Sequence, residues 1–117
     1  GIRIAAVEAC MHHPKGGAGG DPSLVRVCEC RKPKGGMLDA IVSKLGAGRG
    51  SSWMLGDSTS DVQAARAAGL RAGLVFATNR CELCPLRNGV GLAGVTGTTP
   101  DAHGATLAEL AGAILRA

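Results

Sequence analysis

Apolar runs along the chain predict three buried strands. Residues 4–9, 51–55 and 72–77 are short apolar segments with the length and composition of strands covered by neighbouring elements. The second run ends in Gly56-Asp57, so a glycine and a carboxylate follow its carboxyl end. These three segments are the expected sheet.

Helical spacing of apolar residues predicts two helices between those strands. Residues 36–45 form the first, with Gly46 as its stop, and residues 58–68 form the second, with Gly69 as its stop. Ser58 and Ser60 are the N-cap candidates of the second helix. Strands that alternate with helices indicate an α/β fold with parallel strands.

A last helix is predicted near the end of the chain. Thr106-x-x-Glu109 is a capping box, the usual start of such an element. The helix is expected to bury five apolar residues, Leu107, Leu110, Ala111, Ile114 and Leu115. By contrast, residues 10–34 and 78–104 show little periodicity and are interpreted as loops. A loop as long as 10–34 inside a compact domain needs a reason such as a bound metal.

Composition limits the classes of function. The 117 residues suffice for one domain, and the net charge of +4 suits a phosphorylated substrate. Scattered positive charges and only 2% aromatic residues argue against nucleic-acid binding. The chain has neither a long apolar run for a membrane span nor a signal segment at its start, which favours a cytoplasmic protein. Its 19 glycines leave few large side chains for a core.

Two close pairs of metal-binding residues lie in the first loop. Cys10-x-His12 and Cys28-x-Cys30 supply three thiolates and one imidazole, a set that zinc takes in a closed, structural site. The alternative is four free side chains in a flexible loop. The neighbouring His13 is either a group beside the metal or the substrate, or an ordinary surface histidine.

Basic and acidic residues next to these features suggest phosphate chemistry. Arg31, Lys32 and Lys34 follow the last zinc ligand, so a metal at Cys30 fixes cations that could stabilise a phosphoryl group; the alternative is a solvated basic run. Asp57 at the strand's carboxyl end is a candidate Mg²⁺ ligand. Asp61 could also bind the metal, orient a metal-bound water or favour the helix dipole, and a capped helix explains both carboxylates equally well.

Three sequence strings carry a resemblance to a known family. They are Cys10-Met11-His12-His13-Pro14, then Cys28-Glu29-Cys30-Arg31-Lys32-Pro33-Lys34-Gly35-Gly36-Met37-Leu38, then Gly56-Asp57-Ser58-Thr59-Ser60-Asp61. Together they resemble the D-glycero-D-manno-heptose 1,7-bisphosphate phosphatases of the haloacid dehalogenase superfamily. The related histidinol-phosphate phosphatases share the zinc loop. The resemblance covers most of residues 4–77, the C-terminal portion of the family's pattern, and is weak over 78–117.

The resemblance implies a partial haloacid-dehalogenase-type, Rossmann-like fold and a set of roles. Cys10, His12, Cys28 and Cys30 would be structural zinc ligands. Arg31 and Lys32 would face the substrate phosphate, with Lys32 neutralising its charge. Asp57 would bind Mg²⁺ with Asp61 as its acidic companion. Members of the family hydrolyse a sugar phosphate through an aspartyl-phosphate, which places this chain in carbohydrate metabolism.

The chain departs from the family at the nucleophile. The family's DxDGT motif and its following Thr or Ser motif are both missing from the 117 residues. We therefore expect residues 1–117 to be a single incomplete domain with a zinc loop at 10–34, inactive and loosely held without a complementing N-terminal segment. The alternatives are a histidinol-phosphate phosphatase-like protein, or a non-catalytic, zinc-stabilised remnant that binds a phosphorylated ligand or a partner.

Two further cysteines, Cys81 and Cys84, have three possible roles. Cys81-x-x-Cys84 could be half of a second metal site with His103, a redox pair, or two incidental loop cysteines.

Overall fold

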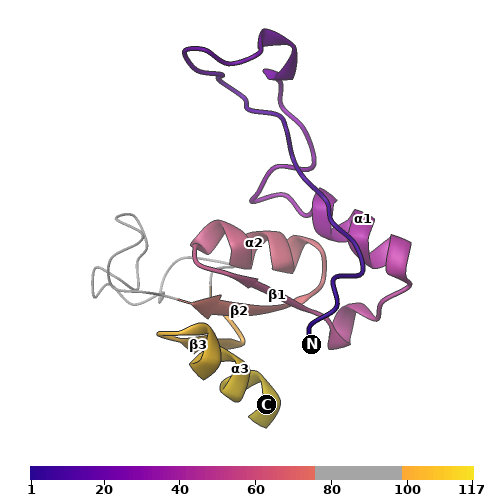
Figure 1. Ribbon diagram of the computed structural model, residues 1–117, viewed down its shortest axis with the longest axis vertical. Coiled ribbons are helices and arrows are strands. Elements are labelled where there is room, and N and C mark those ends of the chain that lie inside the picture. Colours follow the sequence, from indigo (N-terminus) through magenta and orange to yellow (C-terminus); the bar gives the residue numbers. More distant parts are fainter. Residues whose placement is uncertain (76–98) are drawn as a thin grey trace.

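A small parallel sheet forms the centre of the molecule (Figure 1). The computed structural model describes residues 1–75 and 99–117. In them, strands β1 (Trp53–Gly56), β2 (Arg71–Val75) and β3 (Ala102–Gly104) pair in the order β1-β2-β3, and both pairings are parallel. The α/β fold predicted from the alternation of elements is confirmed.

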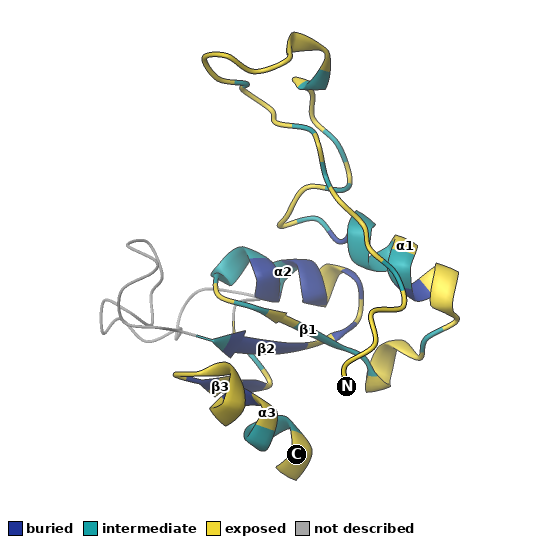
Figure 2. Cartoon of the chain, in the orientation of Figure 1, coloured by how far each residue is buried: buried dark blue, intermediate teal, exposed yellow. Residues whose placement is uncertain are grey.

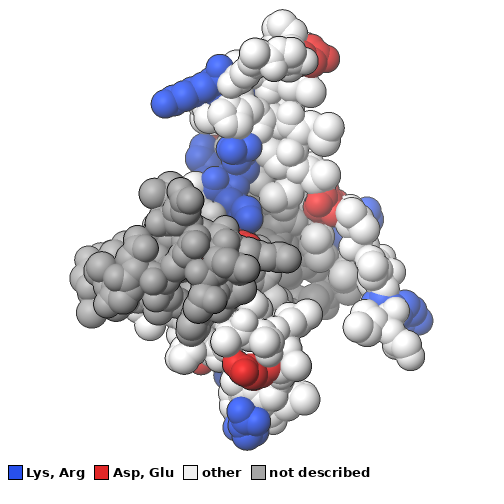
Figure 3. Space-filling view, turned by 60° about the vertical axis from the view of Figure 1, so that its left-hand side comes forward, with Lys and Arg blue, Asp and Glu red and all other residues white. Residues whose placement is uncertain are grey.

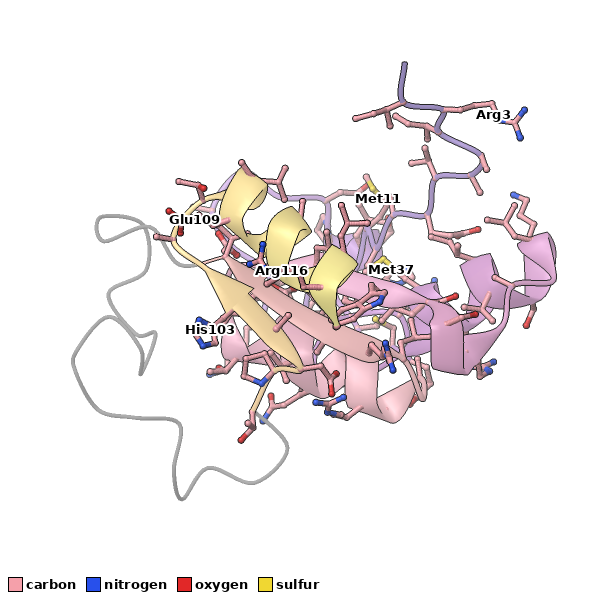
Figure 4. All side chains as sticks on the ribbon, turned by 90° about the horizontal axis from the view of Figure 1, so that it is seen from below. Arg3, Met11, Met37, His103, Glu109 and Arg116 are labelled. Carbon is pink, nitrogen blue, oxygen red and sulfur yellow. The ribbon has the colours of Figure 1, made fainter. Side chains whose placement is uncertain are left out.

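Helices cover both faces of the sheet (Figures 1 and 4). Helix α2 (Thr59–Ala67) connects β1 to β2 and packs on one face, with α1 (Gly36–Leu45) beside it. Helix α3 (Leu107–Arg116) packs on β2 and β3 from the opposite face. The largest fully buried side chains are Leu74, Leu110 and Val62. The main hydrophobic cluster therefore lies between α1, α2 and the sheet, and parts of α2 and β2 are dark blue in Figure 2. Leu110 is buried on the α3 side of the sheet.

Helix boundaries agree closely with the predicted ones. Helix α1 spans the predicted residues, and Gly46 ends it in the left-handed conformation with φ of 60°. Helix α2 takes Ser58 as its N-cap, and Asp61 completes a capping box. Gly69 follows the last turn with φ of 70°, one residue after the C-cap. These positions require glycine because side chains rarely adopt that backbone region.

The prediction of a buried strand at residues 4–9 is wrong. The segment forms no strand, and Ile4 and Val7 are 77% and 76% exposed. A strand is stable only when its N–H and C=O groups pair with a neighbour, and no described strand lies beside this segment. The apolar composition of residues 4–9 favours a strand, but the segment has no neighbouring strand with which to pair among the described residues.

The last helix buries less than predicted. Among its five apolar residues only Leu110 is buried, whereas Leu107 and Leu115 are 62% and 86% exposed. Leu110 packs closely against Gly73 and Gly104, where the absence of side chains on the strands makes room for it. Half of the capping box forms: Thr106 Oγ1 accepts from Glu109 N at 3.1 Å, but Glu109 Oε2 accepts from Ala105 N at 2.9 Å. β3 was not anticipated, because three residues show no measurable alternation.

The predicted first loop is confirmed as an arm that projects from the body (top of Figure 1). Its two sides are joined by backbone hydrogen bonds of 3.0 Å, from His13 N to Leu24 O and from Arg26 N to His13 O. A short 3-10 turn, Pro22–Leu24, lies at the far end. None of the described helices is both long enough and apolar enough to span a bilayer.

Candidate functional site

The four predicted zinc ligands meet at the base of the arm. The ligand atoms of Cys10, His12, Cys28 and Cys30 all lie within 4.8 Å of one another. Cys30 Sγ is 3.0 Å from Cys10 Sγ, 3.2 Å from Cys28 Sγ and 3.5 Å from His12 Nδ1. Pairing of the two sides of the arm brings these residues together, although 18 positions separate Cys10 from Cys28.

The electrostatics of the cluster favour a cation. The hydrogen bond from Cys30 lowers the pKa of Cys28 to about 6, so one thiolate forms easily. The hydrogen bond with Cys10 and the nearby sulfurs raise the pKa of Cys30 to about 12, so further thiolates are disfavoured. A divalent metal removes that repulsion. Zn–S bonds of about 2.3 Å hold neighbouring sulfurs about 3.8 Å apart, so this donor set fits zinc with small movements.

Close after Cys30, Lys32 lies against the buried carboxylate of Asp61. Lys32, two residues after Cys30, forms an ion pair with Oδ1 of Asp61, which is 3% exposed. Oδ2 of Asp61 accepts from Asp57 N at 3.0 Å, Ser58 N at 3.1 Å and Ser58 Oγ at 3.0 Å. Burial alone would raise the pKa of Asp61, but Lys32 and the Ser58 donors hold it below its ordinary value. Asp61 thus organises the turn between β1 and α2.

Glycine at position 56 is required by the same carboxylate. A β-carbon there would clash with the Asp61 side chain. The Gly-Asp-x-x-x-Asp spacing therefore has a packing cause: the fifth residue after Gly56 lies directly against its Cα. The Ser58-x-x-Asp61 capping box was visible in the sequence and could have identified Asp61 as the centre of this turn.

Asp57 lies on the open side of the turn. Its exposed carboxylate makes no hydrogen bond or ion pair within residues 1–75 and 99–117. It lines a cavity of about 350 Å³ together with Lys32 and Asp61. The remaining wall is mainly apolar, from Met54, Leu55, Val75 and Leu107. A free carboxylate and an ammonium group on one cavity suit a metal ion and a phosphate group.

The other predicted residues lie around the arm. Arg31 donates from Nη1 to His12 O at 3.3 Å, which ties it to a residue of the Cys/His cluster. Lys34 pairs with Glu29 at 3.0 Å. His13 accepts at Nδ1 from the backbone N–H groups of Lys15 and Gly16, both at 3.1 Å, and so stabilises a turn of the arm.

The predicted second cysteine pair cannot be placed. Cys81 and Cys84 lie outside the described residues, and His103 projects outward from β3 (Figure 4). One contact was not predicted from the sequence. Nη2 of Arg26 lies 2.6 Å from Nε2 of His12.

Comparison with known proteins agrees with this arrangement. A family model described as HAD-hydrolase-like matches residues 29–82. The chain is 34% identical over 80 residues to a D-glycero-beta-D-manno-heptose-1,7-bisphosphate 7-phosphatase of Yersinia pestis, covering 68% of this chain and 41% of that protein. It is 37% identical over 79 residues to the Escherichia coli K12 protein of the same name, covering 68% and 40%.

A solved structure gives the same likeness. The D,D-heptose 1,7-bisphosphate phosphatase from B. bronchiseptica, crystallised with magnesium and phosphate, is 28% identical with a TM-score of 0.57. The match covers 89% of this chain and 50% of that chain. This chain therefore spans about half or less of the length of the relatives it matches.

The sheet, the turn around Asp61 and these likenesses show a partial haloacid-dehalogenase-type α/β fold. Within that class the chain resembles the D-glycero-D-manno-heptose 1,7-bisphosphate phosphatases, and it matches only part of their length. The resemblance and the partial fold predicted from the three sequence strings are confirmed.

Proposed function

We propose that this chain supplies the metal-binding and charge-neutralising side of a sugar-phosphate phosphatase site. The observation that supports it is the cavity lined by Lys32, which Asp61 holds, and by the carboxylate of Asp57, which has no partner among the described residues. Hydrolysis of a phosphate ester needs positive charge against the phosphoryl oxygens. Lys32 would provide it directly, and Asp57 would provide it by holding a metal cation. The substrate class, a heptose 1,7-bisphosphate, is proposed from the relatives' names.

In this proposal Lys32 is the residue that neutralises the transferring phosphoryl group. Its ion pair with Asp61 holds the ammonium group beside the cavity, so the cation is in place before reaction. Asp57 would hold Mg²⁺ with its free carboxylate, and the metal would add charge stabilisation at the phosphate. Asp61 supports both, because its second oxygen holds the backbone N–H of Asp57.

The zinc cluster would act on the site indirectly. Cys30 is followed by Arg31 and Lys32, so a metal that holds Cys30 in place would also restrict the backbone positions of those two cationic residues. Arg31 would then face a phosphate group of the substrate. The role of zinc in this proposal is structural, since all four positions of a tetrahedral site are filled by side chains.

Turnover would also require a nucleophile. No Asp-x-Asp string occurs in the 117 residues, and covalent phosphoryl transfer needs a carboxylate in line with phosphorus. The chain by itself is therefore expected to bind phosphate and Mg²⁺ without turnover. Phosphate release by the purified chain that disappears in Asp57→Ala would contradict this part.

A binding experiment tests the rest. Inorganic phosphate binding to the zinc-loaded chain, measured by equilibrium dialysis, should strengthen about tenfold when Mg²⁺ is added, the equivalent of about 1.4 kcal/mol. Asp57→Asn should lose that increment, because it removes the metal's charged ligand. Glu8→Gln, a charge removal in the exposed N-terminal segment, should keep it. Phosphate binding that is indifferent to both Mg²⁺ and Asp57 would reject the site.

A further inference from the structure

His12 presents its two ring nitrogens to different partners. Nδ1 faces the cysteines, 3.5 Å from Cys30 Sγ, whereas Nε2 lies 2.6 Å from Nη2 of Arg26. Arg26 is an exposed side chain on the arm, two residues before Cys28. A guanidinium can only donate hydrogen bonds, so Nε2 must be the acceptor in this contact.

Metal binding at Nδ1 is incompatible with that contact. A neutral imidazole carries one N–H, and a metal on Nδ1 leaves the proton on Nε2. Nε2 is then a donor and would meet the donors of Arg26 with nothing to accept. Metal-bound histidines normally donate this proton to a carboxylate, a carbonyl or water. A metal held by Nδ1 would therefore release Arg26 from His12.

A cavity beside the cluster offers Arg26 another partner. The cavity holds about 210 Å³ and is lined by four cationic side chains, Arg26, Arg31, Lys32 and Lys34. Its other lining residues are Pro14, Val27, Cys28 and Pro33, so no carboxylate among the described residues faces it. Glu29, the partner of Lys34, is outside the lining and 86% exposed in its side chain. Figure 3 shows Lys and Arg gathered on one side of the arm.

We propose that this cavity binds a phosphate group and that Arg26 couples its occupancy to the metal. In the metal-free chain Arg26 is held by His12; in the metal-bound chain it turns to the anion with Arg31 and Lys34. Lys32 lines both this cavity and the one containing Asp57. The second phosphate of a bisphosphate is the natural occupant, an identification that rests on the proposed function; the coupling itself does not.

The coupling is reciprocal, so it can be measured without turnover. If metal binding frees Arg26 for the anion, phosphate must tighten metal binding by the same factor. Zinc affinity of the full 117-residue chain is determined by competition with a chromophoric chelator, with free zinc buffered equally with and without inorganic phosphate. Phosphate should tighten zinc binding roughly fivefold or more, the usual size of such couplings.

Two matched variants separate Arg26 from its neighbours. Arg26→Gln should tighten zinc binding in the absence of phosphate, because a cation and a competing donor leave His12, and it should lose the effect of phosphate. Lys15→Gln removes an arm cation that does not line this cavity and should retain the effect. Zinc affinity that ignores phosphate in the unsubstituted chain, or a phosphate effect that survives intact in Arg26→Gln, overturns the proposal. The proposed phosphatase site could fail its own Mg²⁺ test while this coupling holds.

Discussion

Lys32 and Asp61 form an ion pair across 29 positions of sequence, and that pair joins the zinc arm to the turn that follows β1. One end of the pair lies two residues after Cys30 of the Cys/His cluster, and the other lies in the first turn of α2. The Asp61 side chain is buried and the Lys32 side chain is 40% exposed. The pair therefore connects a segment with almost no core of its own to the best-packed part of the molecule.

Removal of the Asp61 carboxylate should weaken the whole fold. Asp61→Ala leaves the N–H groups of Asp57 and Ser58 without their acceptor, in addition to the lost ion pair. We expect the free energy of unfolding of the zinc-loaded chain to fall by about 2–3 kcal/mol. Urea titration followed by fluorescence of Trp53, the single tryptophan, measures this. An unchanged midpoint would show that the turn does not depend on Asp61.

Stability should also depend on pH through the same group. The pKa of Asp61 in the folded chain lies below its ordinary value of 3.8, so the unfolded chain binds its proton more readily. Its stabilisation is present above pH 3.8 and is lost as the pH falls through the lowered pKa. Because zinc is also released in acid, the measurement uses metal-free protein. Between pH 5 and 3 the free energy of unfolding should fall less in Asp61→Asn than in the unsubstituted chain, because the amide has no carboxyl group to protonate.

Gly56 offers a test that changes no charge. Gly56→Ala places a methyl group against the Asp61 carboxylate, so the turn must open or the ion pair must move. We expect a loss of about 2 kcal/mol of unfolding free energy, together with weaker Mg²⁺-dependent phosphate binding. Gly50→Ala is the control, since a β-carbon at Gly50 meets nothing within 4 Å. Equal stability of the two variants would contradict the close approach.

Zinc content should respond to the arm cysteines. Cys30→Ser removes one of three sulfur ligands, and we expect bound zinc, counted by atomic spectroscopy, to fall by about one per chain. Cys81→Ser is the comparison, because incidental cysteines would leave the count unchanged. A loss of zinc in Cys81→Ser would instead assign metal to the second cysteine pair.

Local features of this fold could be read directly from the chain. The ends of α1 and α2 depend on Gly46, Ser58 and Gly69, whose effects act within one helical turn. The four residues of the Cys/His cluster were recognised by their spacing, since each close pair supplies two potential donors from one short piece of backbone. The members of the cluster and the helix boundaries thus follow from neighbouring residues alone.

Pairing over long distances was decided only by the tertiary structure. Residues 4–9 and β3 have opposite outcomes to those their composition suggests, because a strand exists only where another strand accepts its hydrogen bonds. The arrangement around Asp61 is similar: its sequence position allowed a metal ligand or a helix cap, and packing against Gly56 and Lys32 turned it into the centre of the turn. Sequence determined the chemical groups of this protein, and three-dimensional contact determined which of them meet.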